Sequence, residues 1–316
     1  MTVVDRTWIQ KRSTEAVGYK RRLSRYSSTH LVGHGDALSI GTGTTLSALT
    51  FEIVKRQADD GALDLQIVTS NLQVIGMGRY SDPDQDPQEV DRFLRAFRAT
   101  QIVVTGGEVN PSLDSLTGEQ AVLGIRDPLF HPTTVFFGAR GLSFRGGLTI
   151  TYQFLDELSA QEAYATRPTQ RRVVLCDHEK LGIVKGRQAP LRIESLLEHA
   201  NECIFVSTVP ELARDVPRVN REIAAFQELC SELARKELYT DKELALWMIT
   251  AEEERRIVAS LAKARQEQKG ETFAKGGAIL DSIGDLPVET QALAPLTDDS
   301  PIAAATSSSG SNGQRS

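Results

Sequence analysis

Cysteine, methionine, tryptophan and histidine are scarce in this 316-residue sequence, which contains three, three, two and five of them respectively. The cysteines, Cys176, Cys203 and Cys230, are odd in number, far apart and set in apolar stretches. That pattern is typical of buried free thiols in a reducing cytosol. Because no CxxC pair and no histidine–cysteine cluster occurs, we expect no metal site.

Long apolar runs and an excess of basic residues are also missing. No segment approaches the roughly eighteen apolar residues of a membrane span, and residues 1–6 carry no signal-peptide core. The formal net charge of -6 argues against a broadly basic nucleic-acid-binding surface. Basic residues gather locally at 11–12 and 20–22, where a solvated helix face is the simpler interpretation. We therefore expect a cytoplasmic protein without a membrane partner.

Short apolar runs alternate with longer helical patterns between residues 36 and 208. This rhythm is typical of strand–helix units around a largely parallel sheet. It predicts an α/β, Rossmann-like fold whose sheet is flanked by helices. The expected strands are Ala37 to Ile40, Leu65 to Thr69, Ile102 to Thr105, Thr134 to Phe137, Arg172 to Cys176 and Cys203 to Ser207.

The segments outside these strands complete a four-part organisation. From Pro210 the pattern becomes almost wholly helical, with one apolar stripe along 223–233 and a second apolar group at Leu244, Trp247 and Met248. After Gly270 the periodicity is lost, and the end is rich in Ser, Gly, Asn and Thr. We expect an N-terminal arm and lead-in helix over 1–35, an α/β domain over 36–208, a helical extension over 209–269 and a mostly disordered tail over 270–316.

The sequence Gly-Thr-Gly-Thr-Thr at residues 41–45 follows the first expected strand and precedes a helix. Its glycines permit positive φ, its threonines supply hydroxyls, and the helix directs amide groups at the turn. It predicts an anion site of phosphate size, with a purely structural turn as the alternative. The pattern is neither a Walker A loop nor a dinucleotide fingerprint, so we expect neither ATP nor NAD and no cofactor. The residues are Gly41, Thr42, Gly43, Thr44 and Thr45.

Other expected strands also end in small or polar residues, and ligands of open α/β sheets gather beyond such ends. The further candidate ligand residues are Thr69, Ser70, Asn71, Gly106, Gly107, Glu108, Gly138, Arg140, Gly141, Asp177 and Lys180. Each has a plainer alternative: a helix cap at 70–71, a turn at 106–108, a surface arginine in the glycine loop 138–147, where Arg145 is the other candidate, and an ion pair between Asp177 and Lys180. We expect His178 to face solvent.

Taken in order, these segments resemble the effector-binding domain of the DeoR family of bacterial transcriptional regulators. The resemblance covers about residues 15 to 208 and rests on the turn at 41–45, Val68-Thr69-Ser70-Asn71-Leu72, Gly106-Gly107 with Gly118, the glycine loop, and Asp177 to Gly182. It implies a fold related to ribose-5-phosphate isomerase and glucosamine-6-phosphate deaminase, and a phosphorylated sugar as effector.

The resemblance also implies a role in transcriptional regulation. Residues 1–20 do not accommodate a helix-turn-helix, so we expect DNA binding through a partner protein rather than directly, and a homo-oligomeric assembly. The alternative is a sugar-phosphate isomerase or deaminase. Related isomerases carry acids in the glycine loop, but this loop contains none and leaves Glu108, Asp114 and Asp177 as candidate bases. We therefore favour a sensor and expect no catalytic residue.

Overall fold

The computed structural model describes residues 17–61, 63–78, 86–111, 113–149, 155–184, 191–233 and 242–253. The tail expected over 270–316 lies outside these residues. Within the described ranges, no helix combines the length and apolar character needed to cross a membrane.

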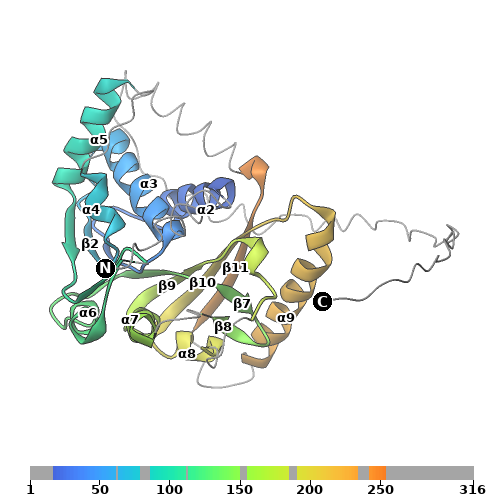
Figure 1. Ribbon diagram of the computed structural model, residues 1–316. Helices are drawn as coiled ribbons and strands as arrows, with labels where there is room; N and C mark the ends of the chain where they lie inside the picture. The colour runs from blue at the N-terminus through green and yellow to red at the C-terminus, as the bar shows by residue number, and fades with distance from the viewer. Residues whose placement is uncertain are drawn as a thin grey trace, which may run out of the picture. The chain divides into compact units, whose positions relative to one another are not determined.

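The centre of the fold is a parallel sheet in which seven strands of the described part are ordered β11-β10-β9-β6-β1-β2-β3 (Figure 1). Every neighbouring pair is parallel, and each of the six expected strands is confirmed. Parallel strands are covered on both faces and therefore read as continuous apolar runs, as in the fully buried Phe136 and Phe137. The bounds are β1 Ala37–Ile40, β2 Gln66–Thr69, β3 Gln101–Val104, β6 Thr134–Gly138, β9 Thr169–Leu175, β10 Ala200–Thr208 and β11 Glu243–Ile249.

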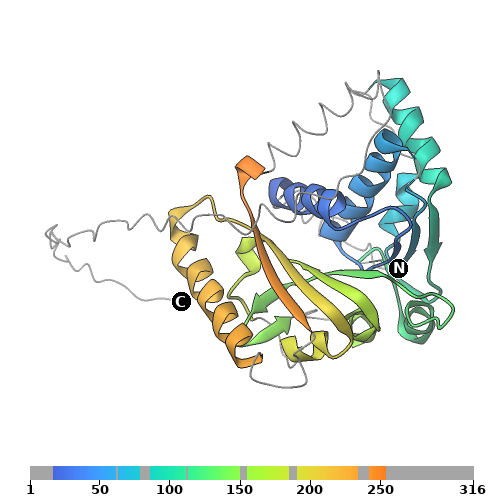
Figure 2. The same cartoon turned by 180° about the vertical axis from the view of Figure 1, so that it is seen from behind.

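Helices cover both faces of this sheet, which confirms the predicted Rossmann-like α/β class. One face carries α2 Val17–His30, α3 Thr44–Asp60, α4 Gln73–Met77 and α5 Pro87–Ala99 (Figures 1 and 2). The other carries α6 Gly118–Ile125, α7 Leu155–Thr166, α8 Ile193–Leu197 and α9 Val216–Leu233 (Figures 1 and 2). Smaller elements are β4 Glu108–Asn110, β5 Ser115–Thr117, β7 Gly141–Ser143, β8 Gly147–Thr149 and the 3-10 helices η1 His178–Lys180 and η2 Ala213–Asp215.

The expected helical extension is only partly helical. Its first part forms α9, but Leu244, Trp247 and Met248 lie in β11, which pairs in parallel with β10 at the edge of the sheet. Pairing with an open strand edge outweighs the local helical pattern here, since a short apolar run fits either structure. The ring of Trp247 packs edge-on to Tyr26 of α2, with centroids 5.7 Å apart. The sheet therefore extends past residue 208.

The strand order contains one reversal, between β1 and β6. From β1 the chain continues outward through β2 to β3, and it then returns to place β6 on the other side of β1. In doubly wound folds, ligands bind beyond the carboxyl ends of the strands at such a reversal. The main-chain amide of Gly41, just after β1, donates to the carbonyl oxygen of Phe136 at 2.8 Å. The turn at 41–45 thus lies at this switch point.

Candidate functional site

The predicted ligand residues follow the carboxyl ends of five adjacent strands, from β3 to β9. With neighbouring strands about 4.8 Å apart, this row is roughly 19 Å long, which exceeds the reach of one sugar phosphate. A small ligand centred at the switch point therefore reaches the ends of β2, β1, β6 and β9 before it reaches Glu108, which is exposed at the start of β4 beyond β3.

The turn at residues 41–45 has the backbone of an anion cradle. Gly43 is the N-cap of α3, with φ 111° and no capping side chain. Its carbonyl oxygen accepts from the amides of Leu46 at 3.0 Å and Ser47 at 2.9 Å. Helix geometry then leaves the amides of Thr44 and Thr45 at the positive end of the helix dipole for a ligand.

A cavity of about 270 Å³ opens beside this turn. Its walls contain Lys20 and Arg21 of α2 as well as Thr44 and Ser47 of α3. Glu52 also lines it but is paired with Arg25, at 3.3 Å. The two cationic side chains were not predicted as ligand residues, since a short basic run carries no signal of what it faces.

The basic group at 20–22 is not the solvated helix face that its sequence suggests. Lys20 and Arg22 are 8% and 7% exposed, whereas Arg21 is exposed. Arg22 forms an ion pair with Glu211 at 2.9 Å. The interpretation fails because α2 is packed against α3 and the sheet on more than one side, which a run of three charges does not reveal.

Asn71 and Ser70 tie β2 to its surroundings. Asn71 Nδ2 donates to Ser47 Oγ at 2.9 Å, and Asn71 Oδ1 accepts from the amide of Gln73 at 3.0 Å as α4 begins. The hydroxyl of Tyr164 accepts from the amide of Ser70 at 2.8 Å and donates to Ser70 Oγ at 3.0 Å. Burial raises the pKa of Tyr164 to about 12, so it stays neutral. These contacts support the structural alternative for 70–71.

Two of the predicted glycines have packing reasons to be glycine. Gly107 has φ 127°, and a Cβ there would lie 2.5 Å from the carbonyl oxygen of Thr117 in the small β4–β5 hairpin. A Cβ on Gly141 would overlap the carbonyl oxygen of Ile183. The glycine loop itself contains the antiparallel pair β7–β8 rather than running freely to a helix. Its Arg145 is paired on the surface with Glu228 at 2.7 Å.

Asp177 and Lys180 form an ion pair beyond the end of β9. The carboxylate of Asp177 is 1% exposed, and its Oδ2 lies 2.6 Å from Nζ of Lys180, whose side chain is 22% exposed. Among the described residues, no other donor with hydrogen-bond geometry reaches either carboxylate oxygen. The predicted mutual pair is thus present, but its carboxylate is buried rather than on the surface.

The expectation that His178 faces solvent is wrong. His178 is 1% exposed, its Nδ1 lies 2.8 Å from Thr208 Oγ1, and its ring meets that of Tyr19 edge-on with centroids 4.5 Å apart. The cause is η1, a single tight turn that directs the ring inward under α2. A three-residue element has no periodicity from which a buried face could be predicted.

Stability should fall in mild acid because of His178. Burial lowers its pKa from the usual 6.5, against the opposing effect of neighbouring carboxylates such as Asp177. The unfolded chain therefore binds the proton more readily than the folded protein. The contribution of neutral His178 to stability is fully present above pH 6.5 and is lost as the pH falls towards the folded pKa. Burial also lowers the pKa of His30. Urea unfolding at several pH values should show that the free energy of unfolding falls less steeply with decreasing pH in His178→Asn than in the wild type. The same pH dependence in both proteins would contradict the role given to His178.

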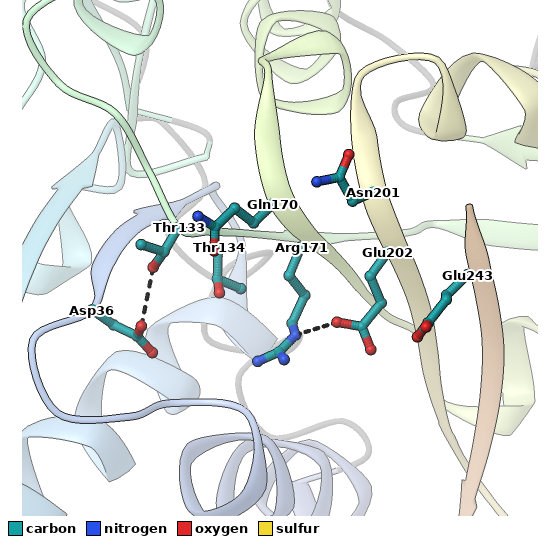
Figure 3. Close-up of a pocket in the computed structure, with 8 residues that line it drawn as sticks. All are labelled: Asp36, Thr133, Thr134, Gln170, Arg171, Asn201, Glu202 and Glu243. Carbon is teal, nitrogen blue, oxygen red and sulfur yellow. Dashed lines mark hydrogen bonds and ion pairs between the residues drawn. The ribbon is translucent and has the colours of Figure 1, made fainter. Parts of the chain in front are cut away.

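A second pocket lies at the opposite, amino-terminal edge of the sheet (Figure 3). Arg171 pairs with Glu202 at 2.6 Å, and Asp36 accepts from Thr133 Oγ1 at 3.1 Å and from the amide of Gly33 at 2.7 Å. Figure 3 shows Glu243 of β11 beside the same group. The amino ends of parallel strands are not where doubly wound folds bind ligands. We therefore place the candidate site at the carboxyl edge.

No family model matches the chain, and no curated protein matches it. Solved structures similar to it include ribose 5-phosphate isomerase A from Methanocaldococcus jannaschii, with 13% identity, TM-score 0.30 and coverage of 51% of this chain and 53% of that one. eIF2B beta from Chaetomium thermophilum has 12% identity, TM-score 0.31 and coverage of 54% and 41%. A probable sor operon regulator from Shigella flexneri has 10% identity, TM-score 0.31 and coverage of 77% and 89%.

The chain thus spans about half the length of the isomerase and less than half of the eIF2B subunit. Similarity at this level assigns neither a family nor a function.

Proposed function

We propose that this protein binds a phosphorylated sugar, with the phosphate at the turn 41–45. The observation that carries the proposal is the position of this turn, which starts a 17-residue helix at the single reversal of the strand order. A helix N-terminus attracts anions, and the crevice at such a reversal gives them access. Lys20 and Arg21 in the adjacent cavity add positive charge.

Asp177 and Lys180, beyond the end of β9, suit the sugar rather than the phosphate. Strand ends with side-chain amides, carboxylates and hydroxyls offer both donors and acceptors to sugar hydroxyls. Asp177 with Lys180 lies beyond the end of β9, two strands from the turn in the sheet order. A ligand with an anionic end and a hydroxylated body matches this distribution better than a free anion does.

We further propose that binding produces a conformational signal, and α2 is the element that supports this idea. Ser24 of α2 donates to the carbonyl oxygen of Thr45 at 3.1 Å, and Tyr19 packs on His178 beside Asp177. One helix therefore touches both ends of the proposed site. A ligand that binds more tightly when α2 is in one position increases the population of that conformation. A regulatory role through a DNA-binding partner, and self-association, belong to the same proposal.

A thermal-shift screen tests this function. We expect the melting temperature to rise with at least one of ribose 5-phosphate, fructose 6-phosphate and glucose 6-phosphate, since a ligand that binds only the folded state stabilises it. Thr44→Val removes the side-chain hydroxyl and should lower the affinity for the responding ligand by roughly 10- to 100-fold, the range for a hydrogen bond to a charged group.

The matched control is Thr29→Val, a half-buried threonine near the far end of α2. It should leave the response unchanged. Failure of every sugar phosphate to raise the melting temperature would count against the sensor. Turnover of a responding ligand would instead favour the isomerase or deaminase alternative.

A further inference from the structure

Gln161 of α7 lies directly beside the turn at residues 41–45. It is 4% exposed, and its Nε2 donates a hydrogen bond to Oγ1 of Thr42 at 2.5 Å. Because the Thr42 hydroxyl accepts this bond, its own hydrogen is directed elsewhere. Gln161 thereby prepares Thr42 as a donor for an anion held in the turn.

The other half of the amide has no hydrogen-bond donor among the residues that the structure describes. This atom, Oε1 of Gln161, is buried. A buried acceptor without a donor is costly, so a ligand that supplies a donor is favoured at this position. Phosphate oxygens at neutral pH act chiefly as acceptors, whereas a sugar hydroxyl can donate.

We infer that Gln161 is a specificity-determining residue that recognises a ligand hydroxyl next to the bound phosphate. This inference rests on the proposed function and narrows it. The ligand class becomes a phosphate monoester of a sugar or polyol with a free hydroxyl close to the phosphate. Gln161 holds Thr42 through Nε2 and accepts the ligand hydroxyl through Oε1, so one side chain serves both parts of the ligand.

Calorimetric titration of the full chain tests the inference with inorganic phosphate, ribose 5-phosphate, fructose 6-phosphate and glucose 6-phosphate as probes. The measured quantity is the affinity for the tightest sugar phosphate divided by the affinity for inorganic phosphate. Gln161→Met removes both hydrogen bonds at nearly constant shape. Loss of the contact with Thr42 lowers the affinities for the sugar phosphate and for inorganic phosphate alike, so this effect cancels in the ratio. We expect the ratio to fall roughly three- to tenfold, the effect of one neutral hydrogen bond.

Two variants complete the test. Gln161→Glu keeps an acceptor oxygen but adds negative charge, so both affinities should fall while the ratio is retained. Gln170→Met changes an exposed glutamine at the opposite edge of the sheet and should change neither. An unchanged ratio in Gln161→Met, or a ratio lost in Gln161→Glu, overturns the inference but not the proposed function. Absence of binding of every probe by the wild-type protein overturns both.

Discussion

Lys180→Met is expected to lower the free energy of unfolding by about 3 kcal/mol, at the low end of the range for breaking a buried ion pair. Methionine keeps most of the apolar stem of lysine but leaves the carboxylate of Asp177, 1% exposed, without its cation 2.6 Å away. The low end applies because the Lys180 side chain is itself 22% exposed. Urea unfolding at neutral pH measures the change.

The control for this prediction is a double-mutant cycle. Asp177→Asn removes the charge that Lys180 compensates, so the double variant should recover most of the stability lost in Lys180→Met. Residues in direct contact couple in this way, whereas independent sites add. Simple addition of the two single effects would mean that the two side chains do not depend on each other in the folded protein.

Gly141→Ala is expected to destabilise the protein by about 3 kcal/mol, the upper part of the usual range for overpacking. The new methyl group would overlap the carbonyl oxygen of Ile183, which is main chain and cannot rotate away. The short strand β7 would have to leave the segment after η1, where Gly182 donates its amide to the carbonyl oxygen of Leu142 at 2.7 Å. Urea unfolding again measures the loss.

Gly138→Ala is the matched control from the same glycine loop. A Cβ on Gly138 finds its nearest neighbour, the carbonyl oxygen of Leu175, at 4.0 Å, which is ordinary contact. We expect its stability within about 0.5 kcal/mol of wild type. Equal stability of both variants would contradict the packing of the β7–β8 pair against residues 181–183. The pair of variants therefore separates a glycine required by packing from one whose position has room for a Cβ.

The sheet could be predicted from the sequence because its strands are short apolar runs that end in small or polar residues. That pattern places 41–45, Thr69 and Asp177 at one edge once the strands are parallel. β11 could not be predicted in the same way. Its sequence, Glu-Leu-Ala-Leu-Trp-Met-Ile, fits a helix or a strand, and only the open edge of β10 decides between them.

Candidate site residues outside motifs could not be predicted from the sequence. Gln161 lies at the candidate site because α7 packs against the turn at 41–45. Lys20 and Arg21 lie there because α2 packs over the N-terminus of α3. His178 is buried by a turn too short to have a face. Each depends on contacts between segments far apart in the chain, which local composition does not encode.

A crystal structure with the sugar phosphate that binds most tightly tests the central claim most directly. The phosphate is predicted at the N-terminus of α3, with its oxygens about 3 Å from the main-chain nitrogens of Thr44 and Thr45. A hydroxyl of the sugar should lie within hydrogen-bond distance of Oε1 of Gln161. A phosphate bound instead beside Arg171 at the opposite edge of the sheet would contradict the account.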